Sequence, residues 1–481
     1  MVKASKSVSP AVIGLLHKFS EPEVSLLREK LLSHYDANHR ILPWRSIAAT
    51  EDDRNKRSYA VWVSEMMLQQ TQVATVISYF EKWISKWPTV ADLSKATLEE
   101  VNQVWAGLGY YSRARRLHEG AVKVMEDLDG EFPSDRDSLV EQLPGVGRYT
   151  GSAIASIALG SCVGVVDGNV NRVMARLRGI GADISAQATA DHMWSLADQL
   201  VDPERPGDFN QAVMELGATV CTPKTPSCSS CPLQSLCVAY RRSQDGQQKT
   251  SISSHFKMVG KSKDKVDESL VKDIECLPEC DLCLRKEDWD SSLGVQNYPR
   301  KGQKTQSRQE TSAVVLLQRP NGQMYFVQRP KTGLLANLWE FPSIALTSEE
   351  ESQWEESTTQ QLQEDFAVPE SYASLRIFVS DVLHIFSHIR QTYKVYKLLL
   401  DDKKPEVICP SKYQGSQWMT REEFMSSATS TAMKKILKAV ESSEQKAKDK
   451  KPKRVQEEKP VDAKKQKTIS QFFNASAKKQ K

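Results

Sequence analysis

Residues 143–169 read LPGVGRYTGSAIASIALGSCVGVVDGN, and the first half of the chain is organised around this stretch. Gly145 and Gly147 lack a Cβ atom and can adopt positive φ, so the turn between them can bring bare N–H groups against an outside anion. Such a turn suits a DNA phosphate. Segment 150–159, rich in Ala, Ile and Ser, predicts a closely packed helix whose N-terminal dipole adds to the turn. Taken alone, the turn also fits an ordinary connection between two helices.

Other motifs accompany this stretch. They are WVSEMMLQQTQV at 62–73, GLGYYSR at 107–113, VVDGNVNRV at 165–173 and four cysteines at 221, 228, 231 and 237. Together they resemble the helix-hairpin-helix DNA glycosylases, and within them the MutY-type adenine DNA glycosylases of animals. The resemblance covers roughly residues 17–440. It implies a mainly α-helical glycosylase domain with a 4Fe–4S loop, followed by a C-terminal α/β domain of the Nudix type.

Bulk composition fits a soluble, intracellular protein. A chain of 481 residues with 40% hydrophobic content is long enough for roughly two to four domains with packed cores. No apolar run approaches the ~18 residues of a membrane span, and AVIGLL at 11–16 is too short for a signal peptide. Nine cysteines, an odd number mostly gathered in two clusters, favour metal or iron–sulfur ligation over disulfides. We expect a monomer with no membrane partner.

Charge is distributed unevenly along the chain. The net charge is +4, yet the segment from Lys434 onward has sixteen Lys and Arg against six Asp and Glu, so the preceding residues carry −6. Binding of duplex DNA by the body of the protein must therefore depend on local basic patches and backbone amides.

Two carboxylates are candidates for catalysis. Glu65 lies one helical turn before Gln69 within an otherwise apolar helical pattern at 58–87. A solvated helix face is the usual place for such a glutamate, but the Gln-Gln-Thr-Gln segment that follows favours a polar site at a nucleic-acid interface. The resemblance implies that Glu65, kept protonated by burial, is the general acid for a flipped purine. It also implies that Asp167 stabilises the oxocarbenium-like sugar or adds to it.

The resemblance assigns further residues to this site. It implies that Tyr149, Asn169, Arg45 and Gln211 position the carboxylates or contact adenine. Tyr149 also occupies the position where strand-cleaving relatives have a lysine that forms a Schiff base with C1′. Without that amine, we expect base removal only.

The function implied is base-excision repair: removal of adenine opposite 8-oxoguanine or guanine, which prevents G:C to T:A mutations. One alternative is an endonuclease III-like pyrimidine glycosylase with lyase activity, which Tyr149 and the additional C-terminal domain disfavour. The other is a non-catalytic DNA-damage-binding protein, which the pairing of Glu65 with Asp167 disfavours.

The segment GLGYYSRARR at 107–116 alternates stacking surfaces with phosphate-binding charges. We expect Tyr111 to lie in the core, as aromatic residues usually do, and Tyr110 to insert into DNA. Gln70 and Thr71 resemble residues that wedge into the base stack from the catalytic domain.

Two cysteine clusters predict metal sites. Cys221, Cys228, Cys231 and Cys237 supply four thiolates, and their spacing alone cannot separate zinc from an iron–sulfur cluster. The resemblance implies a 4Fe–4S cluster. In the polar segment 241–308, Cys276, Cys280 and Cys283 leave a fourth ligand open, and the resemblance implies zinc there. His17 is our candidate for the fourth ligand, with His255 behind it. This linker is also a candidate contact for the checkpoint clamp.

Residues 309–440 change to the period of strands and predict a mixed α/β domain. The acidic run of a Nudix hydrolase is missing after Gly333, so we expect binding without hydrolysis. In HIFSHIR, the resemblance implies that Phe386, Ser387 and His388 sense 8-oxoguanine, although the segment also fits a plain hairpin end. The predicted domains are thus an N-terminal segment 1–16, a catalytic domain 17–240, a linker 241–308, a recognition domain 309–440 and a basic tail 441–481.

The tail contains a peptide that fits the pattern of sliding-clamp ligands. Residues 466–473 read QKTISQFF, in which Gln466 suits a polar pocket, and Ile469, Phe472 and Phe473 form one apolar plug on a single helical turn. The rest of the tail is Lys-rich and predicts disorder until bound. KKPKR at 450–454 suits nuclear import, so we expect a nuclear protein, with a mitochondrial isoform as a further possibility.

Overall fold

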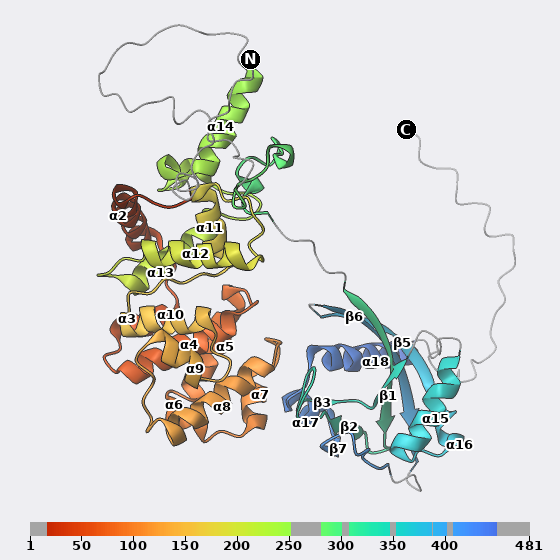
Figure 1. Cartoon of the computed structure of the whole chain (residues 1–481). Coiled ribbons are helices and arrows are strands. Elements are labelled where there is room, and N and C mark those ends of the chain that lie inside the picture. Colours follow the sequence, from red (N-terminus) through yellow and green to blue (C-terminus); the bar gives the residue numbers. More distant parts are fainter. Residues whose placement is uncertain are drawn as a thin grey trace, which may run out of the picture.

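The computed structural model describes residues 17–251, 280–300, 307–346, 353–386, 388–401 and 407–449. A helical part comes first and a part built on a β-sheet follows it (Figure 1). The helices of the first part are α2 (Glu21–Asn38), α3 (Pro43–Thr50), α4 (Arg54–Leu68), α5 (Val73–Lys86), α6 (Val90–Ser94), α7 (Leu98–Trp105), α8 (Ser112–Asp127), α9 (Arg136–Gln142), α10 (Arg148–Leu159), α11 (Gly168–Arg178), α12 (Gln187–Leu200), α13 (Pro206–Thr219) and α14 (Val238–Ser251). None of the described helices is both long and apolar enough to cross a bilayer.

The helical part has two cores. One contains the buried face of α4 together with residues of α5, α7, α8 and α10, including Trp62, Trp83 and Trp105. The other joins α2 to α11, α12 and α13. Figure 1 shows these groups as two lobes, with α3 to α10 in one and α2 with α11 to α13 in the other. Residues from the two lobes can therefore meet where the lobes pack against each other.

The helical pattern predicted over 58–87 is two helices. α4 ends at Leu68 and α5 begins at Val73, because Gln70 adopts a left-handed conformation with φ of 55°. A continuous hydrophobic period hides such a break, since both helices bury residues against the same core.

The turn of the hairpin joins α9 to α10. Gly145 has φ of +76°, and a Cβ atom there would lie 2.4 Å from Cδ of Arg116. Glycine is therefore required at this position for both conformation and space. Gly147 is the N-cap of α10 with φ of −95°, and a Cβ atom there would meet nothing within 4 Å. Only the first of the two glycines uses positive φ.

The second part is a seven-stranded sheet with helices on both faces. Its strands are β1 (Arg308–Gln318), β2 (Met324–Gln328), β3 (Trp339–Glu340), β4 (Ser343–Leu346), β5 (Ile377–Ile385), β6 (Ile389–Leu399) and β7 (Gly415–Met419). The strand order is β3-β2-β1-β6-β5, with β4 paired to β1 and β7 to β2. β1 and β6 run parallel and the other pairs are antiparallel, as in the predicted hairpin of β1 and β2.

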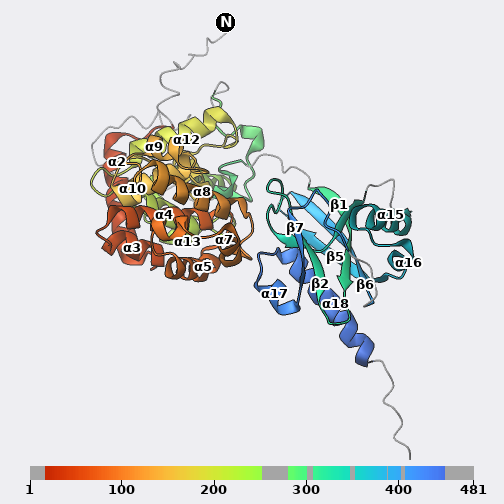
Figure 2. The same cartoon turned by 90° about the horizontal axis from the view of Figure 1, so that it is seen from below.

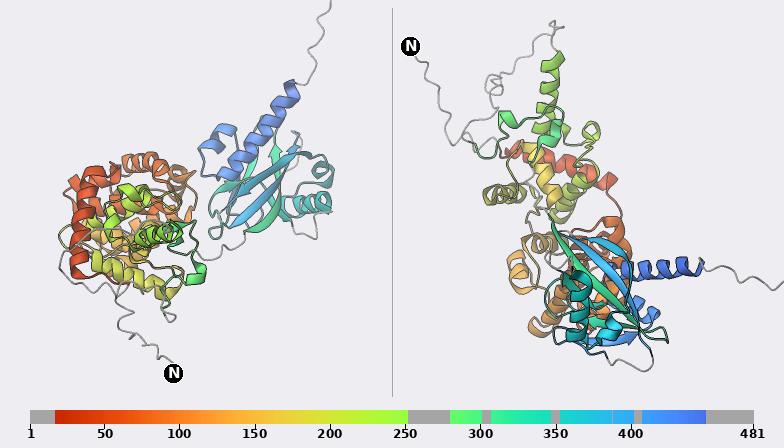
Figure 3. Two further views of the ribbon diagram at one scale, coloured as in Figure 1. Left: turned by 90° about the horizontal axis from the view of Figure 1, so that it is seen from above. Right: turned by 90° about the vertical axis from the view of Figure 1, so that its right-hand side faces the viewer.

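Side chains alternate along β1 and so build two cores. Val315 and Leu317 pack toward α15 (Trp354–Phe366) and α16 (Glu370–Ala373), while Val314 and Leu316 pack toward α17 (Arg421–Ser426) and α18 (Thr431–Asp449). The single closing helix predicted over 421–440 is thus two helices, and α18 continues to Asp449 and projects beyond the sheet (Figure 3).

Direct contacts join the two parts, and α17 faces α7 in two views (Figure 1, Figure 2). The backbone N–H of Ala428 donates to Oε1 of Glu99 at 3.1 Å. The hydroxyl of Tyr111 donates to the carbonyl of Thr429, also at 3.1 Å. Ala428 belongs to the same buried core as α4. Tyr111 therefore lies in the core, as expected, and helps to dock the sheet domain.

Candidate active site

The helical part contains a cavity of about 340 Å³ that brings together residues from both lobes. Glu65 enters it from α4 and is only 5% exposed. Tyr149, on the first turn of α10, donates a hydrogen bond of 2.5 Å to Oε2 of Glu65. Asp167, the N-cap residue of α11, lines the same cavity. The other predicted residues that line it are Arg45, Gln70, Thr71, Asn169 and Gln211.

Asp167 is fixed by the helix that it begins. Its Oδ1 accepts from the backbone N–H of Val170 at 2.7 Å, and its Oδ2 accepts from Nδ2 of Asn169 at 2.8 Å. Asn169 is held in turn by Arg172, whose Nη2 donates to Oδ1 of Asn169 at 2.8 Å. A Cβ atom on Gly217 would lie 2.7 Å from Cβ of Asn169. The close packing of α13 on α11 thus depends on a glycine.

Burial raises the pKa of both carboxyl groups, but different neighbours act against this effect at each of them. Burial raises the pKa of Glu65 to about 7; the hydrogen bond from Tyr149 acts against this, and the charge of Asp167 adds to it. Burial also raises the pKa of Asp167, but the N–H of Val170 and the amide of Asn169 favour its ionised form. Burial and the neighbouring carboxylates raise the pKa of Tyr149 well above its usual value, so the phenol stays a donor. The cavity therefore brings together a carboxyl group that holds a proton for part of the time near neutral pH and a second carboxyl group whose ionised form accepts two hydrogen bonds.

An ion cluster around the buried Glu215 forms one wall of the cavity, and sequence patterns did not indicate it. Glu215 on α13 is 6% exposed and binds both Arg40 and Arg45. Glu215 lies one turn after Gln211 on the same helix, so a polar stripe along 211–215 was the available signal.

Tyr110 and Gln70 project from two neighbouring loops. The hydroxyl of Tyr110 donates to Oε1 of Gln70 at 2.5 Å, and Tyr110 is 42% exposed. Both residues have positive φ, 49° for Tyr110 and 55° for Gln70. The sequence suggested Arg113 as a phosphate-binding charge, but its guanidinium is buried and donates to the carbonyls of Met66 at 2.8 Å and Gly109 at 3.0 Å. One buried side chain therefore ties both loops together.

A second cavity, of about 370 Å³, lies where the sheet domain meets these loops. Tyr110 and Arg115 line it from the helical part. Phe386 and His388 line it from the end of the β5–β6 hairpin, and Leu334 lines it from the loop before β3. Ser387, between Phe386 and His388, lies outside the described residues.

Cys221, Cys228, Cys231 and Cys237 line one small cavity of about 30 Å³ beside α11. Nη1 of Arg176 lies 3.3 Å from the sulfur of Cys221. The four cysteines therefore converge on one place. Among the described residues, one other set has three potential metal ligands with their donor atoms within 4.8 Å of one another.

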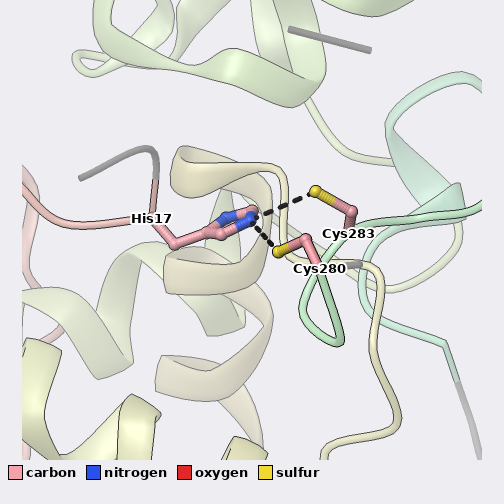
Figure 4. A group of neighbouring side chains, drawn as sticks. All are labelled: His17, Cys280 and Cys283. Carbon is pink, nitrogen blue, oxygen red and sulfur yellow. Dashed lines mark hydrogen bonds between the residues drawn. The ribbon is translucent and has the colours of Figure 1, made fainter. Parts of the chain in front are cut away.

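The compact set is His17, Cys280 and Cys283 (Figure 4). Nε2 of His17 lies 3.4 Å from the sulfur of each cysteine, and its Nδ1 lies 3.1 Å from the carbonyl of Arg178. His17 is 3% exposed, and burial lowers its pKa to about 4, so the imidazole is neutral and able to act as a ligand. His17, the residue predicted as the fourth ligand, therefore lies beside two of the linker cysteines, and this arrangement suits one metal ion.

Several predicted residues fall outside the part of the chain that the structure describes. They are Cys276 and His255 in the linker, and Gln466, Ile469, Phe472 and Phe473 in the tail.

Comparison with known proteins gives consistent matches to both parts. A profile of the HhH-GPD superfamily base excision DNA repair proteins matches residues 63–199, and a NUDIX domain profile matches residues 313–439. The human adenine DNA glycosylase is 50% identical over 440 residues, which cover 90% of this chain and 77% of the human protein. A thermostable thymine-DNA glycosylase structure matches 46% of this chain and 97% of its own, with 27% identity and a TM-score of 0.39. The C-terminal domain of mouse MUTYH in complex with human PCNA matches 29% of this chain and 91% of its own, with 35% identity and a TM-score of 0.24.

Proposed function

This chain belongs to the adenine DNA glycosylases, and we propose that it removes adenine paired with 8-oxoguanine, or with guanine, by hydrolysing the N-glycosidic bond. One observation carries the proposal: Tyr149 donates a hydrogen bond to Glu65 in the same cavity that Asp167 enters. That arrangement offers an acid and a carboxylate to a single flipped base. Removing such an adenine before replication prevents a G:C to T:A change.

Glu65 would act as the general acid. Adenine leaves more readily once it is protonated, typically at N7, because it then departs as a neutral base. A pKa of about 7 allows a substantial share of Glu65 to hold a proton at neutral pH. Asp167 would then stabilise the oxocarbenium-like sugar, or add to it, before water completes the hydrolysis. Asn169 orients Asp167 through their 2.8 Å hydrogen bond, and Arg45 and Gln211 line the space for the base.

The reaction would stop at base removal. A strand-cleaving glycosylase needs an amine that attacks C1′, and Tyr149 has none to offer. Its raised pKa also keeps the phenol protonated, so it does not replace the amine as a nucleophile.

Recognition of the opposite base would take place at the second cavity. Tyr110 and Gln70 would enter the base stack, and the hairpin residues 386–388 would read 8-oxoguanine from the sheet domain. The support is that Tyr110, Phe386 and His388 line one cavity between the two parts. A hydroxyl at Ser387 both donates and accepts, which suits the altered N7–H and O8 edge of the oxidised base.

Two metal groups are part of the proposal. A 4Fe–4S cluster would be held by Cys221, Cys228, Cys231 and Cys237, and the support is that all four line one cavity. When bound, the cluster would cross-link the loop 221–237 beside α11, whose Arg176 approaches the sulfur of Cys221, and would take no part in the hydrolysis. His17, Cys280 and Cys283, with Cys276, would hold a zinc ion that fastens the linker to the catalytic domain.

The tail would bring the enzyme to newly made DNA. We infer a sliding-clamp ligand from Gln466, Ile469, Phe472 and Phe473, and nuclear import from the basic run at 450–454. A double replacement, Phe472→Ala with Phe473→Ala, should abolish capture of the clamp while adenine removal from short duplexes continues at the normal rate.

The test of the main proposal is a single-turnover assay on short duplexes that contain A opposite 8-oxoguanine, G or T. We expect alkali-dependent cleavage with the first two and none with the third. Glu65→Gln and Asp167→Asn should each abolish adenine removal and leave binding of the mispair largely intact. Cleavage without alkali would contradict the hydrolytic mechanism. Near-normal rates for Asp167→Asn would contradict the role given to that carboxylate.

A further inference from the structure

Glu215 has a place in the cavity that the reaction described above does not use. It accepts hydrogen bonds from Nε of Arg40 at 2.6 Å, from Nη2 of Arg40 at 2.9 Å and from the Arg40 backbone N–H at 3.2 Å. Its Oε2 also accepts from Nη2 of Arg45 at 2.9 Å. Arg45 is further held by the carbonyl of Arg40 at 3.1 Å and lies 5.5 Å from the centroid of the Tyr35 ring. Glu215 is thus the anion on which the placement of both guanidinium groups depends.

Charge makes this cluster relevant to Glu65. Burial acts to raise the pKa of Glu215, but hydrogen bonds from Arg40 and the charge of Arg45 outweigh it, so Glu215 is ionised at neutral pH. The cluster then holds two cations and one anion. The groups that face Glu65 are Tyr149 from α10, Asp167 from the start of α11 and Arg45 from α3. Asp167 favours the protonated form of Glu65, and Arg45 favours its ionised form.

We propose that Glu215 is a positioning residue that holds Arg45 at the cavity wall and offsets its charge, so that Glu65 retains the proton that it gives to adenine. Two opposing charges then act on Glu65: Asp167 favours its protonated form, and Arg45, whose charge is offset by Glu215, favours its ionised form. This inference rests on the proposed role of Glu65 as the acid.

Replacing Glu215 with glutamine tests the electrostatic part of this role. The amide oxygen can still accept from Arg45, but it carries no charge, so Arg45 should favour the ionised form of Glu65 more strongly. The pH at which the single-turnover rate falls to half should decrease by about one unit, which makes the variant about tenfold slower near pH 8 and close to wild type near pH 5.5. Glu215→Asp keeps the charge, so its half-rate pH should match the wild type even where its maximal rate is lower.

Two further variants separate charge from structure. Arg40→Gln combined with Glu215→Gln removes one cation together with the anion and should return the half-rate pH toward the wild-type value. Glu340→Gln breaks another buried ion pair, in which Nη1 of Arg329 lies 2.7 Å from Oε2 of Glu340 in the sheet domain, and should leave the half-rate pH unchanged.

The assay uses the full chain with its metals on a short duplex with A opposite 8-oxoguanine, and duplex affinity is measured in parallel. A Glu215→Gln enzyme that is slower by the same factor at every pH, or whose half-rate pH does not decrease, overturns this inference alone. Adenine removal by Glu65→Gln would instead overturn the proposed function on which it rests.

Discussion

Replacing Tyr149 with phenylalanine should extend adenine removal to higher pH. The phenol donates to Oε2 of Glu65 at 2.5 Å, and a donor favours the ionised carboxylate over the neutral acid. The pKa of Glu65 is therefore lower than burial and the charge of Asp167 would make it without this bond. Under the proposed role of Glu65 as the acid, the rate of adenine removal falls as pH rises through that pKa. Loss of the phenol should move the fall to higher pH.

The size of the shift follows from the strength of the bond. A hydrogen bond to a charged group contributes about 1.5–3 kcal/mol, and one pKa unit corresponds to about 1.4 kcal/mol. The pKa of Glu65, about 7 in the wild type, should thus rise by about one to two units in Tyr149→Phe. We expect the lower figure, because water that enters near the missing hydroxyl replaces part of the bond.

The assay is single-turnover adenine removal from about pH 6 to about pH 9.5, across the range in which Glu65 should titrate. Tyr59→Phe is a matched control, because the buried hydroxyl of Tyr59 on α4 donates to the carbonyl of Trp87 at 3.0 Å. Its half-rate pH should equal that of the wild type. A half-rate pH for Tyr149→Phe that stays in place or moves down would refute the reasoning, whatever happens to the maximal rate.

Three other outcomes follow from the described contacts. The raised pKa of Glu65 contributes stability that is fully present below about pH 4.5 and is lost as pH rises through about 7. Glu65→Gln should therefore raise the thermal unfolding midpoint by several degrees at pH 8 and hardly at pH 5. Equal midpoints of the variant and the wild type at pH 8 would contradict this. Gly145→Ala should destabilise the protein by at least about 1–2 kcal/mol and weaken duplex binding, since its φ is positive and Arg116 fills the space, whereas Gly147→Ala should be mild in the same unfolding and binding measurements. His17→Ala should lose one equivalent of bound zinc in a metal analysis while iron content stays constant, and full zinc retention would exclude His17 as a ligand.

Glu65 and Asp167 could be identified as candidates from the sequence because each belongs to a local pattern. Glu65 lies among apolar helix positions, and Asp167 lies at the start of a helix, where an aspartate caps the first turn. Their convergence was implied by the resemblance alone. Hydrophobic periodicity gives the buried face of a helix, but it does not say which buried faces meet across two lobes.

Long-range polar contacts were the part that sequence reasoning missed. Glu215 pairs with Arg40 and Arg45, which lie 175 and 170 positions earlier in the sequence. No short motif marks such a cluster, because Glu215 lies on α13, Arg45 on α3 and Arg40 in the loop before α3, and each alone fits a solvated face. The break between α4 and α5 at Gln70 was not predicted, because it too depends on a contact between residues far apart in the sequence. The carbonyls at the end of α4 find their partner in Arg113, on a helix that begins at Ser112.

The guanidinium of Arg113 also couples the two loops to each other. Gln70 and Tyr110 each adopt a backbone conformation that costs a non-glycine residue roughly 1 kcal/mol, and neither loop can relax without releasing the same buried side chain. The loops should therefore open together or not at all, as one cooperative unit. The cost of ordering them is met when the protein folds, before any duplex arrives. Under the role proposed for Tyr110, a side chain that is already in place needs little further loss of entropy to enter a base stack, which favours rapid testing of many base pairs during a search along DNA.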